Sequence, residues 1–222
     1  ILVPRETPGL TVREHDKSGR NLGSGGELLF ALYHGTRGEF VFTDCRVPAE
    51  NLLEEKRKDS LISDPRPNGR GIPESQAMNL GIGRIAYEAA LEYAKLRIQG
   101  GQPILQHEAI GTMLADMAIK LEAARNLVWH AAWALDHPDA LADGSLSNLP
   151  LQTIAEVFTS EVVHKVTLDA ALIFGGSGVM RDLPMQKYVR DALIFLHSEK
   201  DNNVARFRIA EALAGYRRPL AA

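Results

Sequence analysis

The sequence predicts a mainly α-helical protein, in which a C-terminal four-helix-type bundle follows part of a β-domain. Beyond residue 71, apolar residues recur at steps of three and four, which is the period of helices that bury one face. Before residue 54, short apolar runs alternate with Gly, Pro and Asp, the pattern of strands and turns. We therefore expect a partial β-domain over residues 1–53, a linker over 54–70 and a helical bundle over 71–222.

The first 53 residues contain few candidate strands. The apolar runs lie at residues 2–3, 28–30 and 40–42. So few strands would leave a sheet with unpaired edges. The chain also starts without an initiator Met, so we expect it to be incomplete at its N-terminus.

Residues 54–70 are polar, contain Pro65 and Pro67, and are expected to connect the two parts. The first bundle helix is predicted from Pro73, whose missing N–H is harmless in a first turn, to Gln99. Gly100 and Gly101 are expected to end it.

The second helix gives the strongest periodic signal of the chain. It is expected to end at His137 and Pro138, before a loop over residues 139–150 that is rich in Asp, Gly, Ser and Asn. Its apolar residues fall on one face that should pack against other helices; they are Ile110, Met113, Leu114, Met117, Leu121, Ala124, Val128 and Ala131.

Three further helices complete the bundle. The third is expected to end at Gly175 and Gly176, the fourth to begin near Pro184, and the last, which is short and basic, to cover residues 202–214. Helices joined by short loops after a β-segment predict a bundle packed on the end of a β-domain. The expected buried faces are Ile154, Phe158, Val162, Val166 and Ala170 in the third helix, and Tyr188, Ala192 and Phe195 around the fourth.

Composition excludes several classes of function. The chain is 45% hydrophobic and 24% charged, with a formal net charge of -3, which is typical of a globular protein and argues against a nucleic-acid partner. Charged residues interrupt the apolar stretches, so we expect no membrane span. Cys45 is the only cysteine. We therefore expect no internal disulfide, no metal site and a reducing cytoplasmic location.

Five segments carry a family resemblance. Residues 41–53 read V-F-T-D-C-R-V-P-A-E-N-L-L, and residues 93–104 read Y-A-K-L-R-I-Q-G-G-Q-P-I. They are followed by L-A-D-M-A at 114–118, F-G-G-S-G at 174–178 and Y-V-R-D-A at 188–192. Each motif alone is weak. In this order and spacing they resemble the acyl-CoA dehydrogenase family over almost the whole chain.

The resemblance implies an FAD-dependent enzyme that introduces an α,β double bond into an acyl-CoA thioester. This reaction needs a base for the α-proton and an acceptor for the β-hydride, which no side chain can supply and a flavin can. The family also implies an electron acceptor, such as an electron-transfer flavoprotein, and a homodimer or homotetramer.

By resemblance, the base is Glu199, eight residues after Asp191. The pattern alone favours a different interpretation, in which Glu199 is a surface charge after a helix that ends near His197. Lys200, a candidate substrate contact, replaces a Gly of the family, and its ammonium favours a lower carboxylate pKa than a base needs. Asp201, a candidate cofactor contact, stands where Thr is common, and Glu74 is the alternative base.

The resemblance also identifies cofactor contacts. Arg97 would bind the diphosphate of an FAD held mainly by a neighbouring subunit; alternatively it is an exposed arginine near a helix C-terminus. His107 and Glu108 occupy the next flavin-contact positions, or are simply polar residues early in a helix. Gly175 and Gly176 would let backbone N–H groups approach phosphate, and they would also end a helix.

Arg70 lies near a region that contacts coenzyme A in the family, although a solvated linker arginine fits equally well. Gly100 replaces a Phe that packs on the cofactor, and Leu172 replaces a Gln. These departures leave two alternatives open. One is a catalytically silent subunit that completes a partner's flavin site, and the other is an acyl-CoA oxidase-type relative.

Overall fold

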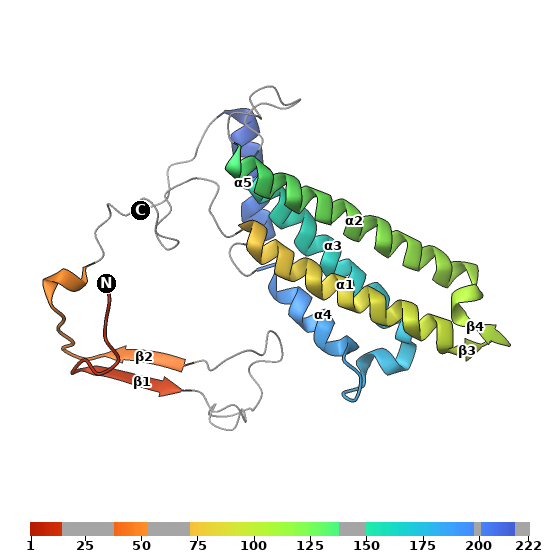
Figure 1. The fold of residues 1–222 in the computed structure, drawn as a ribbon, viewed down its shortest axis with the longest axis horizontal. Coiled ribbons are helices and arrows are strands. Elements are labelled where there is room, and N and C mark those ends of the chain that lie inside the picture. Colours follow the sequence, from red (N-terminus) through yellow and green to blue (C-terminus); the bar gives the residue numbers. More distant parts are fainter. Residues whose placement is uncertain (15–37, 53–71, 138–149, 198–200, 216–222) are drawn as a thin grey trace. The chain divides into compact units, whose positions relative to one another are not determined.

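The computed structural model describes residues 1–14, 38–52, 72–137, 150–197 and 201–215 (Figure 1). It divides into two compact units, Ile1–Pro65 and Arg66–Ala222. The boundary falls inside the stretch expected to be a linker. Each unit is described by itself.

The N-terminal unit contains an antiparallel pair of strands, β1 (Leu10–Glu14) and β2 (Gly38–Phe42). Strand β2 contains the apolar run expected at residues 40–42. The expectation of a strand at residues 2–3 is wrong, because this segment joins no sheet; the N–H of Leu2 donates instead to the carbonyl of Asn51 at 2.8 Å. The run at residues 28–30 lies outside the described residues.

The C-terminal unit is helical, which confirms the predicted fold class (Figure 1). Its helices are α1 (Ile72–Leu96), α2 (Glu108–Asp136), α3 (Leu151–Phe174), α4 (Met185–Ile194) and α5 (Asn202–Ala214). Helix α3 packs against each of the other four. The bundle is therefore organised around α3.

Helix α3 is buried on more than one face. Sixteen of its 24 side chains are buried, so the single stripe expected from Ile154 to Ala170 describes it incompletely. Phe158, which that stripe placed inside, is 40% exposed. The segment Leu151–Val179 is long and apolar enough to cross a membrane by length and composition. Burial among four helices accounts for that composition without a membrane.

Small residues bring α1 close to α3. Ala86, Ala90 and Ala94 of α1 are fully buried. A Cβ placed on Gly83 would lie 2.8 Å from Leu121 Cδ2 and 3.1 Å from Val163 Cγ2. Helices α1, α2 and α3 therefore meet at Gly83 with no room for a side chain.

The structure confirms some of the predicted helix ends and contradicts others. Helix α2 ends at Asp136 with His137 as its C-cap, and α5 covers the predicted residues. The assignment of Gly100 and Gly101 as a helix stop is wrong. Helix α1 ends at Leu96, and the two glycines, with φ of 62° and 84°, connect β3 (Ile98–Gln99) to β4 (Gln102–Pro103). A two-residue hairpin turn requires positive φ, which glycine adopts without strain.

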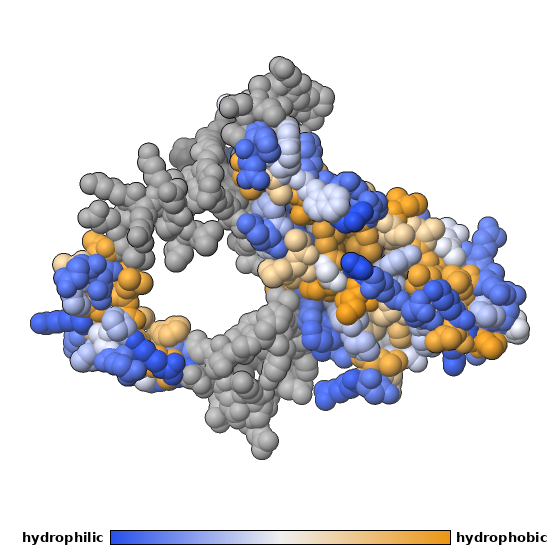
Figure 2. All heavy atoms as spheres, in the orientation of Figure 1, coloured by the Kyte–Doolittle hydropathy of each residue, from blue (hydrophilic) through white to orange (hydrophobic). Residues whose placement is uncertain are grey.

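Several large apolar side chains of the helical unit face solvent, and hydrophobic residues reach the surface on the face seen in Figure 2. On α2, Ile119 is 66% exposed and Trp129 is 60% exposed. Arg125 covers one face of the Trp129 ring at 4.6 Å. Exposed apolar side chains of this size suit an assembly of subunits.

Two glycines of α1 test the meeting point of the three helices. Gly81→Ala should stabilise the bundle by about 0.5–1 kcal/mol, because a Cβ there meets nothing within 4 Å and alanine favours a helix. Gly83→Ala gains the same helix propensity but must displace Leu121 and Val163. We expect it to be about 1–3 kcal/mol less stable than Gly81→Ala in chemical denaturation. Equal stability of the two variants would contradict this packing.

Candidate functional site

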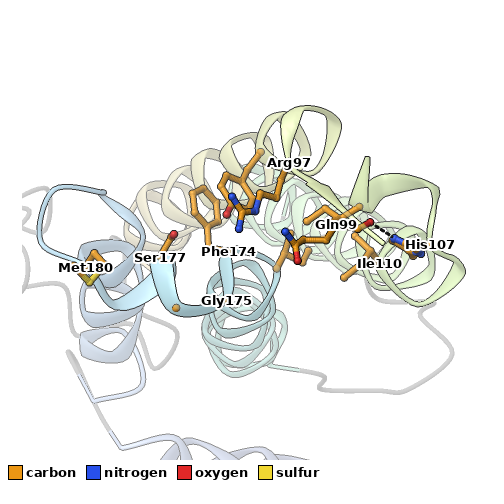
Figure 3. A pocket seen from close by; sticks show the side chains of 12 residues that line it. Arg97, Gln99, His107, Ile110, Phe174, Gly175, Ser177 and Met180 are labelled. Carbon is orange, nitrogen blue, oxygen red and sulfur yellow. Dashed lines mark hydrogen bonds between the residues drawn. The ribbon is translucent and has the colours of Figure 1, made fainter. Parts of the chain in front are cut away.

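A cavity of about 640 Å³ lies where α1 and α3 end (Figure 3). Its lining comes from the end of α1, the β3–β4 hairpin, the start of α2, and the end of α3 with the 3₁₀ turn Gly175–Val179 that follows. The lining residues are Tyr93, Arg97, Gln99, Ile104, His107, Ile110, Ile173, Phe174, Gly175, Gly176, Ser177 and Met180.

An aromatic pair joins the two helices at this cavity. The rings of Tyr93 and Phe174 are stacked, with centroids 4.2 Å apart and planes 15° from parallel. Offset stacking of this kind stabilises a contact beyond the area it buries. With Ile104, Ile110 and Ile173, the pair gives the cavity a largely apolar wall.

Arg97 places a positive charge in this apolar setting. Its backbone is fixed, because its N–H donates to the Tyr93 carbonyl and its own carbonyl accepts from the Ile104 N–H, both at 2.8 Å. Within the described part of the chain, its guanidinium has no hydrogen-bond or ion-pair partner. A guanidinium offers several N–H donors in a planar fork that suits phosphate or carboxylate oxygens. The cavity therefore has an unused anion-binding group.

The glycine turn leaves backbone open to the cavity. Gly175 ends α3 with φ of +59°, a conformation that side-chain-bearing residues rarely adopt. A Cβ on Gly175 or Gly176 would meet nothing within 4 Å, whereas one on Gly178 would lie 2.4 Å from the Ala171 carbonyl oxygen. Gly178 thus serves packing, and Gly175 and Gly176 leave space in which a ligand can approach the main chain.

His107 supports the hairpin beside the cavity. Its Nε2 lies 3.0 Å from the Gln99 carbonyl oxygen and its Nδ1 3.4 Å from the Gln102 side-chain nitrogen. A carbonyl only accepts and an amide nitrogen only donates, so the neutral ring with its proton on Nε2 satisfies both contacts. A Cβ on Gly100 would lie 3.2 Å from the His107 ring. His107 therefore shapes the β3–β4 turn as well as lining the cavity.

The structure brings Arg97, His107, Gly175 and Gly176 together at this cavity. Glu108 is exposed in the first turn of α2 and is not part of the lining. The remaining candidates Glu199, Lys200 and Arg70, with the chain around each, lie outside the described residues.

Asp201 precedes α5, and α5 lies toward the end of the bundle opposite the β3–β4 hairpin (Figure 1). It caps α5, with Oδ1 accepting from the Asn203 N–H at 2.8 Å and Oδ2 3.2 Å from His197 Nδ1. The Asn203 backbone hydrogen bond, more than the His197 contact, lowers the pKa of Asp201. Helix α5 packs near Ser160, which precedes Phe174 by 14 residues of α3, roughly 21 Å along the axis.

Sequence reasoning missed most of the apolar and polar wall. Tyr93 and Phe174 stand inside two of the quoted motifs, at their first positions, so their place there was a usable signal. Ile104, Ile110 and Ile173 looked like ordinary core residues of their helices. Gln99 and Ser177 also stand inside the quoted motifs, whereas Met180 carried no periodic or motif signal of its own.

The groups that line this cavity suit a phosphorylated cofactor with an aromatic ring. Arg97 and the open glycine turn suit a diphosphate, and the Tyr93–Phe174 side of the cavity suits a flat apolar group. Several large apolar side chains next to these residues in the sequence are between 53% and 79% exposed. They are Leu96, Ile98, Leu172, Val179 and Met180.

Known proteins resemble this chain along most of its length. The family described as "Acyl-CoA dehydrogenase, C-terminal domain" matches residues 74–214. An acyl-CoA dehydrogenase of Bacillus subtilis is 37% identical over 216 residues, which are 97% of this chain and 52% of that protein.

Solved structures show the same relationship. The butyryl-CoA dehydrogenase of Megasphaera elsdenii is 32% identical with a TM-score of 0.75, covering 96% of this chain and 50% of that one. A structure described as an electron transferring flavoprotein of Acidaminococcus fermentans is 33% identical with a TM-score of 0.74, covering 95% and 50%. The chain spans about half the length of these relatives.

The matched family covers α1 to α5 and therefore contains both the cavity and the capped start of α5. The chain belongs to the acyl-CoA dehydrogenase family, and its helical unit is that family's C-terminal domain.

Proposed function

We propose that this chain is the C-terminal part of an FAD-dependent acyl-CoA dehydrogenase that introduces an α,β double bond into an acyl-CoA thioester. The observation that carries the proposal is Arg97. It is a cation without a partner among the described residues, in the same cavity as the open Gly175–Gly176 backbone and a stacked aromatic pair. Such a cavity suits the diphosphate of FAD.

The chemistry divides between the cofactor and the chain. Bound FAD supplies the acceptor for the β-hydride. This chain supplies the base, which we assign to Glu199, a carboxylate that removes the α-proton of the thioester. Arg97 and the glycine turn hold phosphate groups, and His107 keeps the hairpin beside them in shape. Lys200 and Arg70 remain the candidates for contact with the coenzyme A part of the substrate.

The distance along α3 supports a flavin shared between subunits. The Arg97 cavity lies beside Phe174, and the start of α5 lies beside Ser160, roughly 21 Å away along the axis of α3. One chain therefore presents its phosphate-binding cavity and the start of α5 near opposite ends of α3. A homodimer or homotetramer, in which each cavity serves the flavin of a neighbour, brings the two functions together. Exposed apolar side chains next in sequence to the cavity residues suit such a contact.

The proposed partners are an acyl-CoA substrate and a protein electron acceptor. The likeness to the Megasphaera elsdenii butyryl-CoA dehydrogenase supports the substrate class. The likeness to the Acidaminococcus fermentans structure, described as an electron transferring flavoprotein, supports an acceptor of that kind.

Arg97 can be tested through cofactor retention. Arg97→Ala in the full-length protein should weaken FAD binding by roughly ten- to a hundredfold, since charge-assisted hydrogen bonds to phosphate are lost. Arg97→Lys should restore only part of it, because an ammonium cannot form the two-pronged contact. FAD titration and FAD content after gel filtration measure both.

Arg84→Ala is the matched control for Arg97→Ala. Arg84 is an exposed arginine of the same helix, and its guanidinium is already paired with Glu88 at 2.7 Å. It should leave FAD binding unchanged. If Arg97→Ala retains FAD as well as Arg84→Ala does, Arg97 is an ordinary surface arginine.

Glu199 can be tested through reduction of the flavin by substrate. Glu199→Gln should keep FAD and still bind acyl-CoA, but bleach the flavin at least about 10²-fold more slowly, a barrier increase of about 3 kcal/mol. Without removal of the α-proton, no hydride leaves the β-carbon. Stopped-flow mixing with acyl-CoA under anaerobic conditions measures the rate. Reduction at the parental rate would place the base elsewhere, with Glu74 the next candidate.

Lys200→Gly is the companion change. It removes a cation that holds the Glu199 carboxylate ionised, so the pKa of the base should rise and the acid limb of the pH–rate profile should move to higher pH. A parent protein that no acyl-CoA bleaches would instead favour the catalytically silent subunit.

A further inference from the structure

The two aromatic residues of the cavity stand next to its two candidate phosphate-binding groups (Figure 3). Tyr93 lies one helical turn before Arg97, and the Arg97 N–H donates to the Tyr93 carbonyl at 2.8 Å. Phe174 is the last residue of α3 and directly precedes Gly175. The stacked rings, with centroids 4.2 Å apart, therefore join the segment that carries the guanidinium to the segment that carries the open backbone.

The stack adds a large contact where α1 otherwise buries small side chains. From residue 86 to its end, the side chains that α1 buries completely are Ala86, Ala90 and Ala94. Small side chains let helices approach closely, but they form shallow ridges that resist sliding of one helix along another less than large side chains do. Phe174 is only 8% exposed, so its ring is enclosed against Tyr93. The stack therefore fixes how the ends of α1 and α3 lie relative to each other.

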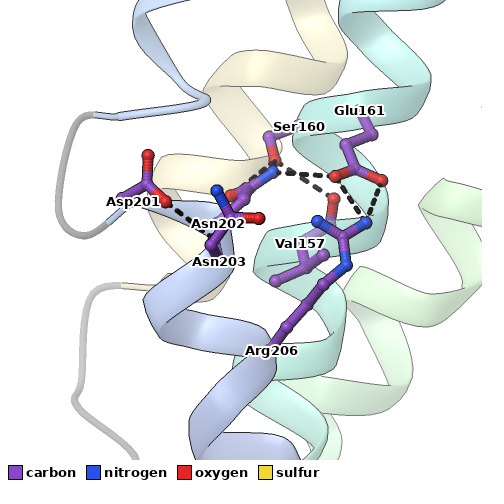
Figure 4. A network of polar contacts seen from close by, with 7 residues as sticks. All are labelled: Val157, Ser160, Glu161, Asp201, Asn202, Asn203 and Arg206. Carbon is purple, nitrogen blue, oxygen red and sulfur yellow. Dashed lines mark hydrogen bonds and ion pairs between the residues drawn. The ribbon is translucent and has the colours of Figure 1, made fainter.

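Polar contacts hold the opposite part of α3 instead (Figure 4). The Asn202 side-chain nitrogen donates to Ser160 Oγ at 3.0 Å and to Glu161 Oε1 at 3.3 Å. The Arg206 guanidinium contacts the same carboxylate at 2.6 Å. Ser160 precedes Phe174 by 14 residues, roughly 21 Å along the helix. These contacts lie far from the cavity, so the geometry there depends on the contacts that Phe174 itself makes.

We propose that Tyr93 is a positioning residue of the phosphate site, whose ring, stacked on Phe174, fixes the Arg97 guanidinium relative to the backbone of Gly175 and Gly176. This inference rests on the proposed function. A diphosphate has to reach the guanidinium and the backbone N–H groups together, so its affinity depends on their separation. A shift of about 1 Å takes an N–H···O contact of about 2.9 Å out of hydrogen-bond range.

The ring of Tyr93, not its hydroxyl, carries this role. The ring makes the stacked contact with Phe174, whereas the hydroxyl has no hydrogen-bond partner in the part of the chain that the structure describes. Tyr93→Phe keeps the ring and removes the hydroxyl. Tyr93→Leu removes the ring as well and leaves an apolar side chain. The two variants therefore separate stacking from a direct contact between the hydroxyl and the cofactor.

FAD titration of the full-length protein is the first measurement. Tyr93→Leu should raise the dissociation constant of FAD by about three- to tenfold, the size of effect expected when about one hydrogen bond is lost. Tyr93→Phe should bind FAD within about twofold of the parent, because the stack remains. Equal losses in the two variants would show that the hydroxyl contacts the cofactor directly, and would overturn the positioning role.

Combining Tyr93→Leu with Arg97→Ala tests whether Tyr93 acts through Arg97. If it does, removal of the ring should have no further effect on FAD affinity once the guanidinium is gone, so the double variant should bind FAD as Arg97→Ala does. A residue that only stabilises the bundle would weaken binding by the same factor in both backgrounds. Additive losses would therefore overturn the inference.

Val128→Ala is the matched control for lost packing. Val128 is buried in a separate apolar cluster with Ala131 and Leu151. Its truncation should lower the stability of the bundle in chemical denaturation while leaving the FAD dissociation constant unchanged. Should Tyr93→Leu fail to fold, Phe174→Leu removes the same stack from the other helix. It should weaken FAD binding by a similar factor, again without effect when Arg97 is alanine.

The outcomes separate this inference from the proposed function. FAD affinity equal to the parent's in Tyr93→Leu would overturn the positioning role, while a loss of FAD in Arg97→Ala would leave the proposed function standing. A loss of affinity in Val128→Ala as large as that in Tyr93→Leu would mean that any loosening of the bundle weakens the site, and would also overturn it. A parent protein that binds no FAD would remove the proposed function and this inference together.

Discussion

Burial of α3 on several faces is the constraint on which the rest of the helical unit depends. A helix that packs against four others can approach α1 closely only where residues are small, and Ala86, Ala90, Ala94 and Gly83 supply that spacing. The stacked rings of Tyr93 and Phe174 then close one end of the α1–α3 contact. The cavity lies at this end because both helices stop there, one at the β3–β4 hairpin and the other at Gly175.

The same helix separates two kinds of chemistry. One end combines an apolar wall, a guanidinium without a partner in the described part of the chain, and open backbone, which suits a cofactor with phosphate groups. The other end is rich in buried polar side chains, and Asn202 joins it to α5. Packing of α3 in the middle keeps these ends at a constant separation. In the proposed enzyme, an assembly of subunits would bring the phosphate-binding end of one chain to the flavin served by the base of another.

Much of this could be predicted from the sequence, because helix periodicity and turn residues are local. The face of α2 and the bounds of α5 were predicted correctly. Predictions failed where tertiary contacts decide which side chains are buried, where a helix ends and which distant residues meet. Phe158 fits a four-residue stripe but is 40% exposed. Gly100 and Gly101 resemble a helix stop but form a hairpin turn, and the link from Asn202 to Ser160 joins residues 42 apart.

We propose that this chain belongs to an enzyme in which an acyl-CoA reduces bound FAD. The most direct measurement is an anaerobic titration of the purified full-length protein with acyl-CoA thioesters of different chain length, followed through the visible absorption of the flavin. We expect bleaching that saturates near one acyl-CoA per flavin for at least one thioester, with the 2-enoyl-CoA as product. A protein that holds FAD and is bleached by a chemical reductant, but by none of the thioesters, would contradict it.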